Sequence, residues 1–362
     1  MLIFRYLAKE VFFTLVALTI ILMLIFLSNQ FVGYLNRAAG GQFSSMIIMK
    51  LMMFEIPNLL VLLLPLGFYV ALLIAYGRLY AESEMTVLHA CGYSPSQLLK
   101  SSLVMATIVF IVVSIIMIWL SPIINTERTQ LLKTSASGVK NLIQLIQPGR
   151  FQADGRGGKI FYVESMNRDH SRAKNVFLAH LNINKSQPSW DIVWAEKAFT
   201  ESDPKTSEEY LIMQKGQVYQ GFPGFANYQV AEFDQYNLRI PHQKIAAVHN
   251  DLRTATLASL LPFNNPDKAK AAELQWRLSV PIMVFVLTLV AVPLSRVNPR
   301  LGKYAKLLPA IVIYIIYANF IFVSRDWMIS GKIPWWIGVW WLHLTIALLG
   351  GLLIWRNRVK LS

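Results

Sequence analysis

Six apolar blocks without a charged side chain dominate this sequence. Each is about 17–21 residues long, which is enough for a helix to cross the hydrocarbon core of a bilayer. Three blocks precede a long polar interval and three follow it. The blocks are 11–31, 57–76, 103–120, 278–294, 307–323 and 335–355. The pattern predicts an α-helical membrane protein with six transmembrane helices, three plus three, and excludes an ordinary soluble core.

The composition supports this class and excludes several kinds of functional site. Only 15% of the 362 residues are charged, against about 25% in soluble domains. The single Cys91 excludes an intramolecular disulfide and a cysteine-based metal cluster. Residues 155–159 resemble part of a phosphate loop but lead into a strand, so they predict a hairpin turn. Without a complete nucleotide-binding motif, the chain is expected to bind no cofactor and to be no enzyme itself.

The positions of Lys and Arg predict the orientation in the membrane. If the six helices alternate, most of the cations near their ends fall on one side, which the positive-inside rule assigns to the cytoplasm. These cations are Arg5, Lys9, Arg78, Lys100, Arg296, Arg300, Lys303, Lys306, Arg356, Arg358 and Lys360. Both termini are therefore expected in the cytoplasm and residues 122–275 outside it. That interval is close to neutral, which argues against nucleic-acid binding despite the net charge of +14.

The exported interval changes to short alternating runs rich in Val, Ile, Phe, Tyr and Trp, as strands are. Five strands are predicted, with turn signals between them, at about 160–163, 175–183, 190–199, 210–219 and 228–240. Such spacing indicates an antiparallel sandwich, roll or barrel. Helical stretches at about 127–147 and 267–277 connect it to the membrane. We expect three regions: transmembrane helices in 1–121, a β domain in 122–275 and transmembrane helices in 276–362.

A short cytoplasmic segment between the second and third spans carries distinctive residues. Residues 80–90 predict a helix along the membrane surface, Gly92 suits the position after its end, and Ser94-Pro95 suits the start of the next helix. Glu82 and Glu84 are carboxylates on a side rich in cations. They either pair with an arginine of a partner protein or belong to a solvated helix face.

Polar residues in and near the spans have two readings. Asn319 and His343 within spans five and six indicate interhelical hydrogen bonds or a cavity. Glu55, just before span two, lies near the exported interface, where water or Lys50 could satisfy it. Cations flank the exported ends of spans one, two, five and six. They are either interface anchors or a rim for an anionic lipid head group. These cations are Arg37, Lys50, Arg325 and Lys332.

Residues 78–95, RLYAESEMTVLHACGYSP, resemble the cytoplasmic coupling helix of the LptF/LptG permeases of lipopolysaccharide export, the LptF branch in particular. Residues 3–7, 273–277 and 292–303 agree with the same family, and the resemblance extends over essentially the whole chain. It implies the membrane part of an ABC transporter in the inner membrane of Gram-negative bacteria, with a jellyroll-like periplasmic domain. It also implies an LptG-like permease partner, two LptB-like ATPase subunits that carry ATP and Mg²⁺, and the jellyroll proteins LptC and LptA.

The resemblance also implies roles for particular residues. Glu84 matches the family's contact with LptB. Spans one and five would form lateral gates, near whose exported ends lie Gly33, Tyr34, Arg37 and Arg325. Family members carry basic residues at the positions of Gln30 and Gly33, so Arg37 is the nearest cation here.

An exported lipid must keep its acyl chains out of water, at about 0.8 kcal/mol per CH₂ group. Alternating strands can provide an apolar groove for them. By alternation, the expected inward side chains are Phe161, Val163, Phe177, Val193, Ile212 and Val218. The leading function is therefore a permease subunit that extracts lipopolysaccharide for outer-membrane biogenesis. The alternatives are a membrane-anchored scaffold with an exported interaction domain, and an ion-coupled secondary transporter, which would need ionisable groups deep within several spans.

Overall fold

A computed structural model describes most of the chain. The described residues are 2–39, 45–136, 148–154, 159–167, 172–182, 189–202, 209–221, 228–239, 252–261, 267–297 and 306–359. The chain forms two compact units. The first, here called the membrane unit, comprises Met1–Gln30, Lys50–Glu127 and His249–Ser362; the second, the β unit, comprises Phe31–Met49 and Arg128–Val248.

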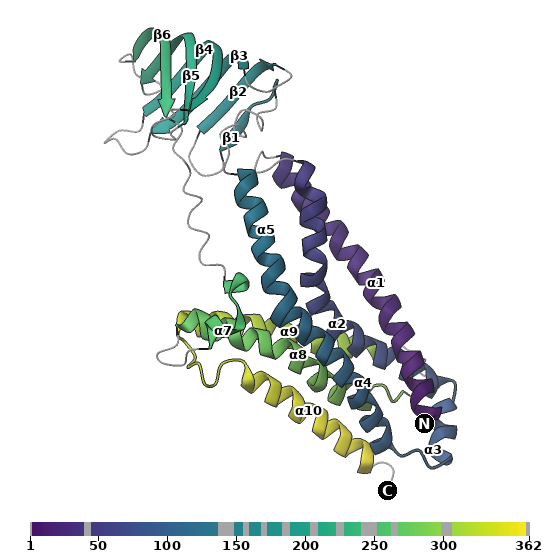
Figure 1. The fold of residues 1–362 in the computed structure, drawn as a ribbon. Coiled ribbons are helices and arrows are strands. Elements are labelled where there is room, and N and C mark those ends of the chain that lie inside the picture. Colours follow the sequence, from purple (N-terminus) through teal and green to yellow (C-terminus); the bar gives the residue numbers. More distant parts are fainter. Residues whose placement is uncertain are drawn as a thin grey trace. The chain divides into compact units, whose positions relative to one another are not determined.

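The first five predicted spans lie in helices, and the sixth, 335–355, is helical from Trp340 (Figure 1). The long helices are α1 (Leu2–Ala39), α2 (Ile48–Ala81), α4 (Pro95–Ile115), α5 (Ser121–Ala136), α8 (Lys268–Leu294), α9 (Leu307–Ser330) and α10 (Trp340–Val359). The short ones are η1 (Ser45–Ile47), α3 (Glu84–Ala90), the π-helical turn η2 (Ile116–Leu120), η3 (Leu252–Thr254) and α7 (Leu257–Leu260). Five described helical stretches are long and apolar enough to cross a membrane. The sixth predicted span forms α10, whose apolar part, Trp340–Arg356, is shorter.

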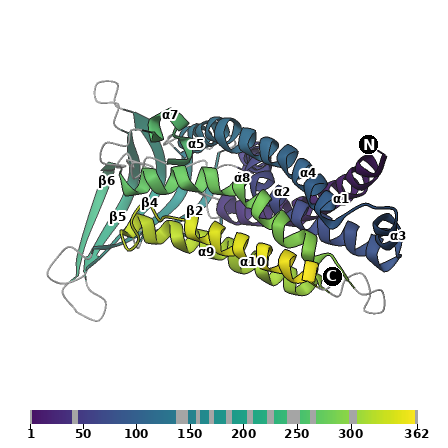
Figure 2. The same cartoon turned by 90° about the horizontal axis from the view of Figure 1, so that it is seen from below.

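Two helices form the centre of the membrane unit. In the apolar stretches of α2 and α8, 67% and 72% of the residues are buried, against 17% for α1 and 22% for α9. Helix α8 packs against α4, α9 and α10, and Figure 2 shows α9 and α10 beside it. In a bilayer the apolar surface of a peripheral helix faces lipid or another subunit without the penalty that water would impose. Most of the apolar surface of α1 and α9 is therefore not covered by other helices of this chain.

Helix α1 packs on the centre along one stripe. Leu7, Val11 and Leu15 are spaced by one turn and are buried in the same cluster as Leu79 and Met85. Farther along, a Cβ atom added to Gly67 of α2 would lie 2.9 Å from Thr19 Oγ1 and 3.2 Å from Leu15 Cδ1. The missing side chain at Gly67 thus permits the close approach of α1, as small residues do between membrane helices.

The third span is continuous through a π-helical turn. Ser94 caps α4 by accepting a hydrogen bond from the Gln97 backbone N–H, and the Gln97 side chain accepts from the Ser94 N–H, with Pro95 at the first helical position. After the π turn, Asn125 of α5 joins Asn58 of α2, which donates to it over 3.2 Å. This contact holds α5 against α2.

The β unit contains one antiparallel sheet. Its strands are β1 (Gln152–Asp154), β2 (Lys159–Met166), β3 (Arg172–Asn182), β4 (Ser189–Ser202), β5 (Glu209–Gly221) and β6 (Gln229–Arg239). The order β1-β2-β3-β4-β5-β6 is a meander. The prediction of an inserted all-β domain and its five strands is confirmed, and β1 is an addition. Among the described strands the two-sheet pairing of a jellyroll is not formed, because each strand pairs with its sequence neighbours.

The buried face of this sheet shifts by one residue halfway along the strands. Ala195 and Ala198 of β4 are both buried although they are three residues apart. The shift coincides with two non-glycine residues of positive φ, Asn175 (50°) on β3 and Lys215 (52°) on β5. The sequence prediction was based on strict alternation. Alternation holds within each half of a strand but not across the position of Asn175 and Lys215.

Two predicted helices have different bounds in the structure. Tyr80 and Ala81 belong to α2, Glu82 and Ser83 form a turn, and the helix predicted for 80–90 is the seven-residue α3. The connection predicted for 127–147 is helical to Ala136 at the end of α5, and 137–147 lie outside the described residues. The hairpin predicted at 155–158 lies outside them as well.

Candidate coupling and lipid-contact sites

The first candidate site is the surface helix α3. Ser83 before it has a left-handed backbone (φ 64°), so the chain turns sharply after α2 and places Glu84 in the first turn of the new helix. A carboxylate there is favoured by the free N–H groups of the helix start. Met85 is fully buried and anchors α3 to the core, whereas Glu84 is exposed.

The end of α3 is as predicted. Gly92 has φ of 90°, its N–H donates to the His89 carbonyl, and the Tyr93 N–H donates to the Leu88 carbonyl, which together form a Schellman motif. Glu84, Val87 and Cys91 are exposed at spacings of three and four residues, so they share one side of α3. This side can contact a partner protein.

Two polar contacts join the amino-terminal end of α1 to this region. The Tyr6 hydroxyl donates a hydrogen bond to Glu84 Oε2 at 2.6 Å. One turn farther along α1, Glu10 Oε2 accepts from Arg78 Nη2 at 2.5 Å. The Glu84 side chain is therefore bonded within its own chain, which the sequence did not predict.

Gln30 and Gly33 occupy the positions where the family resemblance implies cations. Gln30 is half-buried and its Nε2 donates to Glu55 Oε1 at 3.1 Å, so it joins α1 to α2. Gly33 is half-buried as well. Neither residue supplies positive charge, and the contact of Glu55 with Gln30 of the neighbouring helix was not predicted from the sequence.

Tyr34 lies between two guanidinium groups within the β unit. Arg128 Nη2 donates to the Tyr34 hydroxyl at 2.8 Å, and the Arg37 guanidinium carbon lies 5.9 Å from the Tyr34 ring centroid. Tyr34 is only 3% exposed, whereas Arg37 is exposed. The two arginines concentrate positive charge where α1 and α5 meet, and such a pair can bind an anionic group.

Arg325 is in a different environment. Its Nη2 donates to Glu273 Oε2 at 2.6 Å, and its guanidinium carbon lies 5.7 Å from the Trp276 ring centroid. Glu273 Oε1 also accepts from Arg277 Nε at 3.1 Å. Arg277 is 2% exposed and donates to the carbonyls of residues 252, 253 and 255. This set, here called the Glu273 cluster, joins α8, α9 and η3.

The other polar residues of the spans contact helices. His343 is buried, with Nε2 2.8 Å from Ser279 Oγ and Nδ1 bonded to the Tyr317 hydroxyl, so it links α10 to α8 and α9. Asn319 donates to the Ile315 carbonyl of its own helix at 2.8 Å. The His343 contacts are those of an interhelical hydrogen-bond network.

The six groove residues divide between the two faces of the sheet. Phe161, Val193 and Val218 lie in one cross-strand row with Leu178, and Val163 is on the same face. Phe177 pairs with Tyr162 and Trp194 on the opposite face. Ile212 is 5% exposed and lies on the face opposite its neighbours Leu211 and Met213. Phe177 and Ile212 therefore lie on the other face of the sheet from Val193 and Val218.

That apolar face is continuous across strands β2 to β5. It is the buried cluster Val163, Ala173, Val176, Leu178, Val193, Ala195, Ala198, Leu211, Met213 and Val218. Phe161 and Phe233 pack against it. The cluster consists of aliphatic side chains and Met213, a surface suited to acyl chains.

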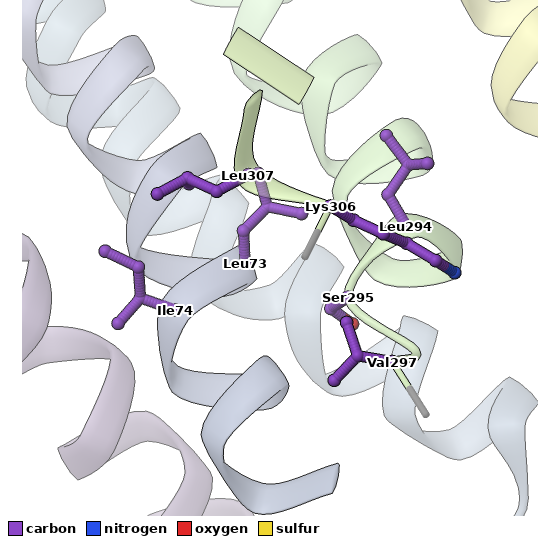
Figure 3. Close-up of a pocket in the computed structure, with 7 residues that line it drawn as sticks. All are labelled: Leu73, Ile74, Leu294, Ser295, Val297, Lys306 and Leu307. Atoms are coloured by element: carbon purple, nitrogen blue, oxygen red, sulfur yellow. The ribbon is translucent and has the colours of Figure 1, made fainter. Parts of the chain in front are cut away.

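A pocket of the membrane unit lies between the end of α8 and the start of α9 (Figure 3). It is lined by Leu73, Ile74, Leu294, Ser295, Val297, Lys306 and Leu307. Its volume is about 10 Å³, room for one water molecule at most, so it cannot hold a lipid. Within the described ranges, no group of three or more His, Cys, Asp or Glu side chains is placed to hold a metal ion.

Sequence reasoning missed Tyr6, Glu10, Arg128 and the ion pairs of Glu273. Glu273 and Arg277 have the i, i+4 spacing of a helical ion pair, which was a usable signal. Tyr6 and Glu84 are 78 residues apart, and Tyr34 and Arg128 are 94 apart, so no local pattern could have found these contacts.

The bundle of long apolar helices with an inserted antiparallel sheet and a short helix between two spans defines a multi-pass α-helical membrane protein. Its sequence matches the family described as lipopolysaccharide export system permease LptF/LptG over residues 5–356. The lipopolysaccharide export system permease protein LptF of Escherichia coli K12 is 31% identical over 318 residues, which cover 88% of this chain and 84% of that protein. The LptF protein of Shigella flexneri matches to the same extent. The chain belongs to the LptF/LptG family, which confirms the resemblance and makes it a permease subunit rather than an enzyme.

Proposed function

We propose that this chain is a transmembrane subunit of a transporter that removes lipopolysaccharide from the inner membrane and passes it toward the outer membrane. The observation that carries the proposal is the family match over residues 5–356, which spans the membrane unit and the β unit alike. A scaffold protein would need neither α3 nor the apolar sheet face, and both are present.

We further propose that both termini and α3 lie in the cytoplasm and that residues 122–275 lie in the periplasm. The distribution of Lys and Arg along the sequence supports this orientation. It places the exposed side of α3 within reach of a cytoplasmic ATPase and the β unit within reach of periplasmic proteins.

The partners follow from this arrangement. The chain pairs with an LptG-like permease, because α1 and α9 carry wide apolar faces that its own helices do not cover. Two LptB-like subunits hydrolyse ATP, so this chain binds no nucleotide. Glu84 pairs with an arginine of the ATPase through a charge-assisted hydrogen bond. LptC and LptA receive the lipid on the periplasmic side.

Lipid enters beside α1 and α9, which act as lateral gates. Because few of their residues pack on the bundle, moving these helices disrupts little buried surface. Arg37 and Arg128 hold the phosphates of the head group, in place of cations at Gln30 and Gly33. The acyl chains then follow the apolar face that contains Val163, Val193 and Val218. This contact avoids the cost of exposing their CH₂ groups to water, which is about 0.8 kcal/mol for each group.

Depletion of this protein in its own cell tests the function. Lipopolysaccharide is expected to accumulate in the inner membrane and to decline in the outer membrane, while phospholipid transfer is unchanged. A complementing copy that lacks the β unit should not restore transport. Normal delivery of lipopolysaccharide after depletion would contradict the proposal.

A further inference from the structure

The amino-terminal turn of α1 contacts the coupling region through one face. Tyr6 and Glu10 are one turn apart, and they bond Glu84 at the start of α3 and Arg78 near the end of α2. Leu7 and Val11 beside them are buried in the core. The polar contacts add little to packing, because Tyr6 is 39% exposed and exposed polar contacts contribute little to stability.

The contact with Tyr6 determines how the Glu84 carboxylate is oriented. Tyr6 occupies Oε2 at 2.6 Å, and a carboxylate has a second oxygen, so Oε1 remains for a cation of a partner. A glutamate side chain that is already held in one orientation loses less conformational entropy when it binds. Tyr6 thus holds Glu84 in an orientation ready for an ion pair. Without Tyr6, the Glu84 side chain would rotate freely before binding.

The same contact extends the coupling region to α1. Only 17% of the residues in the apolar stretch of α1 are buried, so its position relative to α2 depends on few contacts. A displacement of Glu84 by the ATPase would act directly on Tyr6. We propose that Tyr6 is a positioning residue of the coupling site, which orients Glu84 toward the ATPase and transmits its displacement to α1.

This inference rests on the proposed function, and Tyr6→Phe in the complete transporter tests it. The variant loses only the hydroxyl. After reconstitution in proteoliposomes with lipopolysaccharide, the amount of lipid released per ATP hydrolysed is expected to fall roughly 3- to 10-fold, the range for loss of one hydrogen bond. Co-purification of the ATPase should fall by no more than the same factor, because Glu84 keeps its carboxylate, and the melting temperature should stay unchanged. Tyr93→Phe is the matched control, because it removes a hydroxyl that contacts Ser101 and the Gln97 carbonyl instead.

A double-mutant comparison shows whether Tyr6 acts through Glu84. In a Glu84→Ala background, Tyr6→Phe should cause no further loss, since the acceptor is absent. Additive losses, a loss of ATPase association in Tyr6→Phe larger than that in Glu84→Ala, or an equal loss in Tyr93→Phe would overturn the inference. If Glu84→Ala uncouples transport while Tyr6→Phe matches wild type, the inference fails and the proposed function stands. If Glu84→Ala is itself fully coupled, both the inference and the proposed ATPase contact fail.

Discussion

Arg325 of α9 donates a 2.6 Å hydrogen bond to Glu273 of α8, and Glu273 accepts from Arg277 at the same time. Two guanidinium groups and one carboxylate leave one positive charge in the cluster. Arg325 is therefore already engaged in holding two helices together. Arg37, which is exposed, is the better candidate for a head-group contact.

The Glu273 cluster is expected to matter for stability. Arg277→Met leaves Glu273 with one partner and removes the donor to three backbone carbonyls, and breaking a buried ion pair in this way costs about 3–5 kcal/mol. The melting temperature of the purified complex in detergent should fall by several degrees. Arg356→Met, at an exposed site of α10, is the control and should melt as wild type does. Equal melting of all three proteins would contradict the structural role.

The close packing of α1 on α2 depends on Gly67. In Gly67→Leu the added atoms meet Thr19 and Leu15, and overpacking of this kind costs about 1–3 kcal/mol. We expect a lower melting temperature and reduced transport. Gly351→Leu, where nothing lies within 4 Å of an added Cβ atom, should have little effect; a larger effect there would disprove the packing argument.

Glu84 is expected to transmit the action of the ATPase. A charge-assisted pair with an ATPase arginine is worth about 1.5–3 kcal/mol. Glu84→Ala should weaken ATPase co-purification or lower lipid release per ATP, with the membrane fold intact. Glu82 lies in the turn before α3, so Glu82→Ala should matter less. Normal assembly and coupling in Glu84→Ala would assign Glu84 to a solvated face.

Lipid should contact one face of the sheet. Photo-crosslinkers at Val163, Val193 and Val218 are expected to yield ATP-dependent lipopolysaccharide adducts. Crosslinkers at Phe177 and Trp194, which pair with each other on the opposite face, should yield few. Similar yields on both faces would exclude a one-sided groove.

Labelling of single cysteines checks the orientation. With Cys91 replaced by serine, a membrane-impermeant thiol reagent added from the periplasmic side should label a cysteine at Asn184 and miss one at Asn298. The reverse pattern would invert the topology and with it the export function.

The helices, helix ends and strands that are determined by residues close together in the chain could be predicted from the sequence. Six uncharged blocks must become helices in a bilayer because the backbone has no other way to satisfy its hydrogen bonds there. Gly92 and Ser94 marked a helix end and start for equally local reasons. The five β strands followed from alternation and turns, although the order of pairing did not.

Errors arose where distant residues or unusual backbone angles decide the outcome. Ile212 was expected on the face of Val218 but lies on the other, because the buried face shifts where Asn175 and Lys215 have positive φ, and alternation contains no information on such a shift. The ion pair of Arg325 was not foreseen because its partner Glu273 is 52 residues away. Both cases depend on tertiary structure.

Helix α1 contains no proline and is unbroken over 38 residues, whereas α2 contains Pro57 and Pro65. From Tyr6 to Gln30 it extends about 36 Å at 1.5 Å per residue, and it is bonded to α2 or α3 at both points. Because the helix between these two contacts is continuous, a displacement at Tyr6 is transmitted to Gln30. In a genetic selection, second-site suppressors of a growth defect in Tyr6→Phe cells should therefore arise at Gln30 or Glu55, far from the original lesion.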